Sequence, residues 1–248
     1  MNLSLSSLPE GYCAVVVGAS GGLGGAFARH LADDPRCAGV VALSRSGAAP
    51  KGVKITPGII DLEDPVSIEQ AIAAAFEAGP VHLVIVASGI LHGEGVLPEK
   101  TWRHLDAASM AKAFAVNTTG PALVARAALD RFPREGKAVF AALSARVGSI
   151  SDNRLGGWHA YRASKAALNQ IIRTCSVELA RKRPQALIVG LHPGTVETAL
   201  SEPFRGNVPD GKLFTPEHSA ERLLAVINAL DAGASGRCFD FAGEEVLP

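Results

Sequence analysis

The sequence predicts an α/β protein in which a doubly wound parallel sheet of about seven strands is covered by helices on both faces. Two observations support this fold class. Short apolar runs alternate with longer stretches of helical periodicity along the chain. The 248 residues are 48% hydrophobic and contain no low-complexity linker, so residues 1–248 are expected to form a single domain with one sizeable core.

The expected strands are short and apolar. Residues 12–18 form a continuous apolar run, as in a strand that is buried on both faces. Residues 81–87 form a second clear run, which only His82 interrupts. The remaining strands are expected at residues 39–43, 54–60, 138–143, 186–191 and 237–241.

Helices are expected between these strands. Leu23, Phe27 and Leu31 recur at helical spacing after the first strand. Residues 65–78 are rich in alanine and follow Asp64, a suitable N-cap. Further helices are expected at residues 109–132, 161–183 and 217–230, and an irregular segment at residues 192–216.

Composition and charge exclude several classes of protein. Lys and Arg number 24 and so do Asp and Glu, which argues against a nucleic-acid-binding surface. No apolar run approaches the roughly 18–20 residues of a membrane span. No Lys or Arg precedes Arg29, which argues against a secretory signal peptide. The four cysteines form no Cys-x-x-Cys pair, which favours reduced thiols in a cytoplasmic protein and no metal site.

A glycine-rich turn at residues 18–25 (GASGGLGG) joins the first strand to the first helix. Glycines placed there allow a tight turn and a close approach to a pyrophosphate, which the helix N-terminus stabilises. This is the dinucleotide-binding arrangement of the Rossmann fold. Two spacings are open, since Gly18 and Gly24 form a motif with either Gly21 or Gly22. Small residues at a closely packed helix start are the alternative explanation.

The residues after the second strand indicate which dinucleotide binds. An NAD site places an acidic residue there, on the adenosine ribose. Here the strand ends in Ser44 and Arg45 with no acid nearby. A hydroxyl beside a guanidinium would bind a 2′-phosphate, so NADP(H) is favoured over NAD(H). An ordinary solvated arginine is the alternative.

Tyr161 and Lys165 lie four residues apart and therefore share one face of the helix expected at residues 161–183. A free tyrosine has a pKa near 10, which is too high for a base at neutral pH. An ammonium about 4 Å from a phenolate would stabilise it by roughly 4 kcal/mol and lower that pKa. The pair predicts a general acid–base, and a surface helix turn is the alternative.

Together these motifs resemble the short-chain dehydrogenase/reductase family over almost the whole chain. The matching segments are GASGGLG at 18–24, Asp61, VASG at 86–89, FAVNTTGP at 114–121, YRASK at 161–165 and HPGTVET at 192–198. The segment SARVGSISDN at 144–153 is similar to the C-factor-like and to the sniffer- and carbonyl-reductase-like members.

The resemblance implies a role for each matching residue. Tyr161 would transfer the proton, Lys165 would bind the nicotinamide ribose, and Asn117 would hold a water in a proton relay. A lid would cover the substrate at residues 199–213. The implied cofactor-binding residues are Gly18, Ser20, Gly22, Leu23, Gly24, Ser44, Arg45, Asp61, Leu62, Ser88, Gly89, Lys165, Pro193, Gly194, Val196 and Thr198.

One departure from the family pattern concerns the residue that polarises the substrate carbonyl. Many members carry a Ser-Ser pair whose second serine has this role, and Ala145 stands at that position. We expect Ser144 to act after a one-residue shift, with Ser149 or no hydroxyl at all as the alternatives. Loss of such a donor costs roughly 10²–10³ in rate.

The expected function is that of an NADP(H)-dependent oxidoreductase, which transfers a hydride between nicotinamide and a carbonyl or alcohol substrate. A cofactor-binding sensor with little turnover is the alternative, and a dehydratase or epimerase on the same fold is a third. The expected partners are a small-molecule substrate and further copies of the chain in a homodimer or homotetramer, with no nucleic acid and no membrane.

Overall fold

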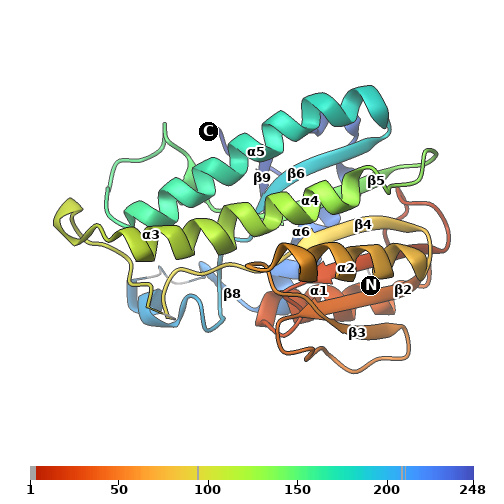
Figure 1. Ribbon diagram of the computed structural model, residues 1–248, viewed down its shortest axis with the longest axis horizontal. Helices are drawn as coiled ribbons and strands as arrows, with labels where there is room; N and C mark the ends of the chain where they lie inside the picture. The colour runs from red at the N-terminus through yellow and green to blue at the C-terminus, as the bar shows by residue number, and fades with distance from the viewer. Residues whose placement is uncertain (1–3, 94, 208, 210) are drawn as a thin grey trace.

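The computed structural model describes residues 4–93, 95–207, 209 and 211–248. Its central element is a parallel seven-stranded sheet with the strand order β3-β2-β1-β4-β5-β6-β9 (Figure 1). This confirms the predicted fold class. The strands are β1 (Tyr12–Val17), β2 (Cys37–Ser44), β3 (Ile55–Ile59), β4 (Val81–Val86), β5 (Ala138–Leu143), β6 (Ala186–His192) and β9 (Cys238–Asp240).

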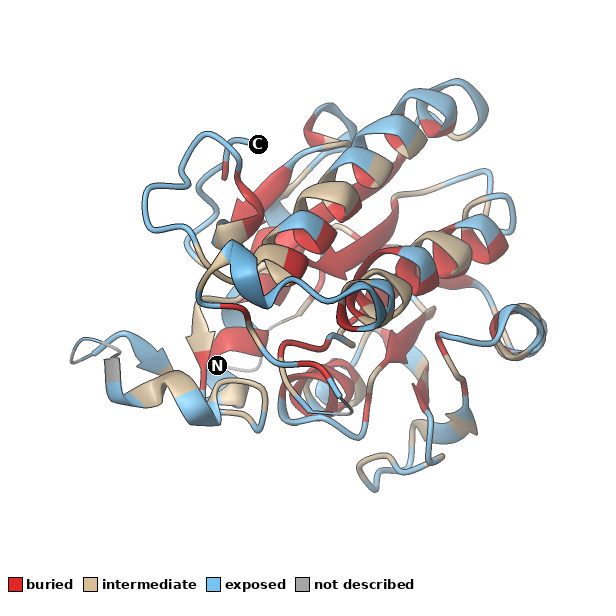
Figure 2. Cartoon of the chain, turned by 60° about the vertical axis from the view of Figure 1, so that its left-hand side comes forward, coloured by how far each residue is buried: buried red, intermediate tan, exposed pale blue. Residues whose placement is uncertain are grey.

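Helices cover both faces of the sheet, as right-handed crossovers between parallel strands require. The pair α1 and α6 packs on one face, and α2, α4 and α5 pack on the other (Figure 1). Figure 2 shows the inner side of these helices buried and the outer side exposed. The helices are α1 (Gly22–Asp33), α2 (Pro65–Glu77), α3 (Ala107–Phe114), α4 (Gly120–Leu129), α5 (His159–Lys182) and α6 (Pro216–Ala229).

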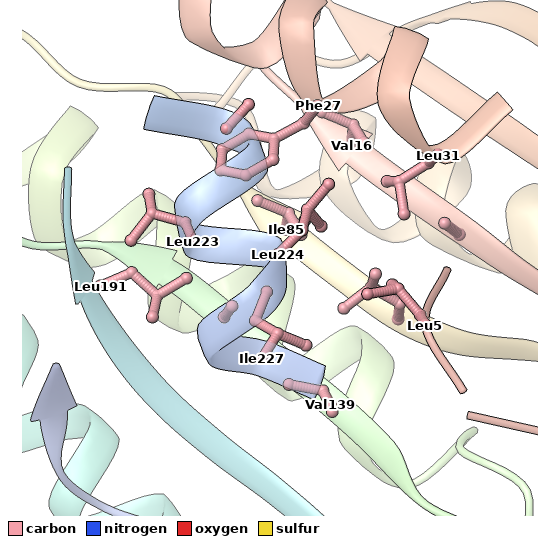
Figure 3. Packing of buried hydrophobic residues seen from close by; sticks show 14 of the residues in the cluster. Leu5, Val16, Phe27, Leu31, Ile85, Val139, Leu191, Leu223, Leu224 and Ile227 are labelled. Carbon is pink, nitrogen blue, oxygen red and sulfur yellow. The ribbon is translucent and has the colours of Figure 1, made fainter. Parts of the chain in front are cut away.

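The sheet separates two apolar clusters, one under each layer of helices. Figure 3 shows the cluster between the sheet and α1 with α6, where Phe27 of α1 and Leu223 of α6 lie above strand residues such as Val16. Each large aliphatic or aromatic side chain buried in this way contributes roughly 1.5–3 kcal/mol. The continuous apolar runs of the central strands follow from this burial on both faces.

The structure interrupts the helix that was expected at residues 109–132. A π-helical turn, Ala115–Thr119, separates α3 from α4, and Gly120 N donates to the carbonyl of Ala115, five residues earlier. Pro121 explains the interruption, because it has no N–H for the carbonyl of Asn117, four residues earlier. The site residue Asn117 therefore lies in a locally widened helix.

The segment expected to be irregular, residues 192–216, contains short elements. These are β7 (Thr195–Val196), a 3₁₀ turn (Glu202–Asn207) and β8 (Leu213–Phe214), which pairs with β7. Val208 and Asp210 of the expected lid lie outside the described residues. Among the helices that the structure describes, none is long and apolar enough to cross a membrane.

A buried carboxylate ties the N-terminal segment to the sheet at the end opposite the glycine turn. Asp34 Oδ2 accepts hydrogen bonds from Leu5 N and the Tyr12 hydroxyl, both at 2.9 Å. Its Oδ1 accepts from the Ser4 hydroxyl at 3.1 Å and from Arg36 N at 3.0 Å. Burial acts to raise the pKa of Asp34, but these hydrogen bonds outweigh it and hold the pKa below its usual range.

Replacing Asp34 by asparagine is expected to lower the free energy of unfolding by about 2–4 kcal/mol at pH 7, because an amide group would face donors that now meet a carboxylate. A depressed pKa contributes stability above the unfolded pKa of about 3.9, and this contribution is lost as the pH falls. Urea unfolding from pH 7 down to pH 3.5 should therefore show the two proteins converging.

The matched control is Asp130→Asn, since the Asp130 side chain is 71% exposed and pairs only with Lys182 at 3.2 Å among the contacts given for it. This variant should unfold within about 0.5 kcal/mol of the wild type at each pH. An Asp34→Asn protein that behaved like this control would show that the buried network adds no stability.

Candidate active site

A cleft of about 700 Å³ opens at the carboxyl ends of the strands, where the order of the sheet reverses on either side of β1. Such a switch point is where open α/β sheets bind ligands. All the expected site residues except Asn117 line the cleft: Gly18, Ser20, Gly22, Leu23, Gly24, Ser44, Arg45, Asp61, Leu62, Ser88, Gly89, Ser144, Tyr161, Lys165, Pro193, Gly194, Val196 and Thr198.

The glycine turn lies at one wall of this cleft, and two of its glycines cannot be replaced without a clash. Gly18 has φ +92°, and a Cβ there would lie 2.6 Å from Ser88 Oγ. A Cβ on Gly24 would lie 2.2 Å from Gly18 O. Helix α1 begins at Gly22 without a side-chain cap, because Gly21 precedes it. The free N–H groups at this helix start fit a pyrophosphate.

The neighbouring strands β2 and β3 form the far end of the cleft. Arg45 is exposed at the end of β2, beside Ser44. The Ser44 hydroxyl donates to the carbonyl of Ala48 at 2.7 Å, so it already has a partner within the loop. Asp61 lies after β3, where its Oδ1 accepts from Glu63 N at 2.9 Å. Of the expected phosphate-binding pair, Arg45 is the member whose side chain is exposed.

Tyr161 and Lys165 both reach the cleft from the first turns of α5. Lys165 is 3% exposed, and its ammonium donates to the carbonyl of Leu143 at 2.7 Å. The same nitrogen lies 5.8 Å from the centre of the Tyr161 ring. The two side chains are therefore neighbours at the end of β5.

The expectation that Lys165 lowers the pKa of Tyr161 is wrong for this structure. Burial raises the pKa of Tyr161 to about 12, because a phenolate would lose its hydration. Burial also lowers the pKa of Lys165 to about 8, against an opposing effect of Cys238. At neutral pH the tyrosine keeps its proton, so the geometry provides a proton donor.

Asn117 acts on the backbone that forms the cleft rather than on the cleft itself. It is fully buried, its Oδ1 accepts from Ile90 N, and its Nδ2 donates to Ile90 O, both at 2.8 Å. The Nδ2 also lies 3.1 Å from the Ser164 hydroxyl, next to Lys165. One amide thus connects the end of β4 to α5.

The structure gives the Ser144 hydroxyl a partner away from the expected carbonyl position. Ser144 Oγ donates to Asn169 Oδ1 on α5 at 2.7 Å. Ala145 lines the cleft without a hydroxyl. Ser149 is buried, and its hydroxyl lies 3.3 Å from that of Ser151. Ser149 is not among the residues that line the cleft.

The loop after β6 contributes the remaining expected residues. Gly194 has φ +74°, and a Cβ there would lie 2.7 Å from the Phe214 ring, so the turn after Pro193 requires glycine. The Thr198 methyl group lies 3.1 Å from where a Cβ on Gly22 would be. This loop therefore closes over the start of α1.

Sequence reasoning missed part of the wall near Tyr161. His92 Nε2 donates to the carbonyls of Ala199 and Leu200, at 3.0 and 3.1 Å. Glu99 is 3% exposed and caps α5 through Ala160 N. No local motif marks either residue, because both act across long sequence separations. Trp158 and Phe204, which sequence reasoning had noted, line the same wall.

Neither metal ligation nor a disulfide contributes to the geometry. Within the described ranges, no three His, Cys, Asp or Glu side chains come together in a way that could hold a metal ion. All four cysteines are free thiols. The chemistry of the site must come from the tyrosine, the lysine and whatever the glycine-lined cleft binds.

Comparisons with known proteins agree with this geometry. The family model for short chain dehydrogenases matches residues 12–208. The C-signal protein of Myxococcus xanthus is 36% identical over 178 residues, which are 71% of this chain and 98% of that protein. The 1-hydroxy-2-glutathionyl-2-methyl-3-butene dehydrogenase of Rhodococcus sp. (strain AD45) is 31% identical over 226 residues, covering 90% and 93% of the two chains.

The fold also matches a solved structure that has a cofactor bound. The NADPH-bound carbonyl reductase from chicken fatty liver superposes with a TM-score of 0.82 and 26% identity, covering 97% of this chain and 95% of that one. The chain belongs to the short-chain dehydrogenase family, as its motifs predicted, and it is an oxidoreductase of that family.

Proposed function

We propose that this short-chain dehydrogenase is an NADP(H)-dependent carbonyl reductase in which Tyr161 donates the proton and Lys165 binds the cofactor ribose. The observation that carries this proposal is the meeting of a protonated tyrosine, a buried ammonium and a glycine-lined helix start in one cleft. No two of these features are adjacent in sequence except the pair on α5. Their convergence is typical of a redox site built for a nicotinamide cofactor.

The choice of NADP(H) rests on the end of β2. Arg45 faces the cleft there, and the lining carboxylates, Asp61 and Glu63, lie one strand further on. A guanidinium binds a phosphate through paired hydrogen bonds, whereas NAD sites favour an acid at this strand end. The NADPH carried by the similar chicken carbonyl reductase supports the same choice.

Each residue has one task in the proposed reduction. When bound, the nicotinamide supplies the hydride. The Tyr161 hydroxyl donates its proton to the substrate's carbonyl oxygen, which its raised pKa favours at neutral pH. Lys165 brings its positive charge beneath the tyrosine, and Asn117 holds the β4 end and α5 at their separation. We assign Ser144 a positioning role through Asn169 in place of carbonyl polarisation.

The segment at residues 199–213 is proposed as the substrate lid, because Leu200 and Phe204 line the cleft beside Tyr161. A single domain, a cytoplasmic location and a homodimer or homotetramer stay predictions from the sequence. The alternative of a sensor with little turnover is not favoured, since the proton donor and its lysine are both in place.

Replacing Tyr161 by phenylalanine is expected to lower kcat for NADPH-dependent ketone reduction by about 10²–10⁴-fold, since general acid catalysis contributes on this scale. NADPH binding should stay within a few-fold of the wild type. The measurement is NADPH consumption by absorbance together with a fluorescence titration of NADPH. An unchanged kcat would overturn the role given to Tyr161.

Ser144→Ala is the matched comparison, because it removes one hydroxyl from the same cleft. With its hydrogen bond directed to Asn169, Ser144 should contribute less than about tenfold to kcat, far from the 10²–10³ of an oxyanion donor. A loss on the larger scale would restore Ser144 to carbonyl polarisation.

Replacing Arg45 by glutamate is expected to weaken NADPH binding by about 100-fold and to leave NADH binding within about threefold, because only NADPH carries the 2′-phosphate. Fluorescence titration of both cofactors measures this ratio. Arg181→Glu makes the same charge change at the exposed C-terminal end of α5 and should leave both affinities unchanged. Equal weakening of both cofactors by Arg45→Glu would rule out the phosphate contact.

A further inference from the structure

We propose that Trp158 is a specificity-determining residue that receives a flat, apolar group of the substrate, and that Glu99 is the residue that positions it. This inference rests on the reductase function proposed above and adds a substrate class to it: ketones or aldehydes whose carbonyl is attached to a planar ring.

The backbone of Trp158 is the first observation. It has φ 53° and ψ 43°, and it is the one residue other than glycine with positive φ in the part of the chain that the structure describes. A bulky side chain in the left-handed region is strained and persists only where its surroundings enforce it. Such strain gathers at functional sites, and Trp158 lies three residues before Tyr161.

Glu99 enforces this conformation from both sides of Trp158. Its carbonyl oxygen accepts a hydrogen bond from Trp158 N at 2.6 Å. Its carboxylate, which is buried, accepts from Ala160 N at 3.2 and 3.3 Å. Gly156 and Gly157 bring the chain into this turn with φ +65° and +66°. One residue from a distant loop thus fixes the turn that starts α5.

The indole ring lies between the proton donor and the proposed lid. Its centre is 6.3 Å from that of Tyr161 in an edge-to-face arrangement, and 4.8 Å from that of Phe204. Phe204 in turn meets His92, with ring centres 5.9 Å apart. His92 holds the lid carbonyls of Ala199 and Leu200. A substrate carbonyl at the Tyr161 hydroxyl would therefore place its substituent beside Trp158.

The chemistry of this end of the cleft favours an uncharged, planar substituent. Besides the aromatic rings, its wall includes Leu91, Val147 and Leu200. The carboxylates among the described lining residues, Asp61 and Glu63, lie after β3, at the cofactor end. Aromatic faces and edges stabilise a second ring beyond its buried area, which an open chain does not gain.

The test compares two ketones with the same number of carbons, acetophenone and 2-octanone, with NADPH. Trp158→Asn keeps a residue that tolerates the left-handed backbone and removes the ring. We expect the ratio of kcat/KM for acetophenone to that for 2-octanone to fall by about tenfold. Trp158→Phe keeps an aromatic ring and should retain at least half of the wild-type ratio. Equal losses for both ketones in Trp158→Asn would overturn the specificity role.

Leu155→Asn is the control, because this side chain is 93% exposed in the same loop and does not line the cleft. It should leave both values of kcat/KM unchanged.

Glu99 is tested by its two substitutions. Glu99→Ala removes the cap and should raise KM for acetophenone by about tenfold with a smaller effect on kcat, because the ring is misplaced while Tyr161 remains. Glu99→Gln keeps an oxygen that can accept from Ala160 N and should restore KM to within about threefold of the wild type. Equal effects of the two variants, or a loss in kcat alone, would reject the positioning role.

Binding can be read without turnover, because the chain has two tryptophans and Trp102 is 72% exposed. In a Trp102→Phe background, Trp158 is the single fluorophore, and acetophenone should quench it saturably while 2-octanone does not. Saturable quenching without turnover of either ketone would refute the proposed reductase and uphold the aromatic subsite. Turnover of both ketones without quenching would refute the subsite alone.

Discussion

The site depends on one buried ammonium. Lys165 is withdrawn from water beneath Tyr161, and the carbonyl of Leu143 at the end of β5 accepts its hydrogen bond. A charge in such a position is costly unless it is paired, and its lowered pKa expresses that cost. The hydrogen bond therefore ties α5 to the central sheet at the point where chemistry is proposed. A long helix carries the catalytic pair, and its position is set by this bond and by the close contact of Gly148 with Lys165 Cβ.

Close backbone approach is the second theme of the structure. Gly18, Gly24 and Gly194 each stand where a Cβ would overlap a neighbour, and all three lie on the cleft. These contacts draw the glycine turn, the end of β4 and the loop after β6 together. The parallel sheet supplies the frame, since strands that run in one direction bring their carboxyl ends to a single edge.

Long-range side-chain bonds complete what the sheet begins. Asn117 joins β4 to α5, and Glu99 joins the preceding loop to the first turn of the same helix. Both residues are buried and satisfied, so each fixes the distance between two segments that are remote in sequence. The result is a rigid surrounding for Tyr161, while the wall formed by Trp158 and Phe204 belongs to a segment that varies with the substrate a protein takes.

Periodicity and glycine chemistry were enough to determine the sheet, its covering helices and the lining of the cleft, because strand burial, turn geometry and the i, i+4 spacing of Tyr161 and Lys165 are local properties of the chain. Local pattern could not determine the π-helical turn at Asn117, the direction of the Ser144 hydroxyl or the raised pKa of Tyr161. These depend on which partners arrive from elsewhere and on how much water they exclude. Hydrogen bonding and dielectric environment at a buried group are properties of the packed structure, and so only the tertiary fold could decide that the tyrosine keeps its proton.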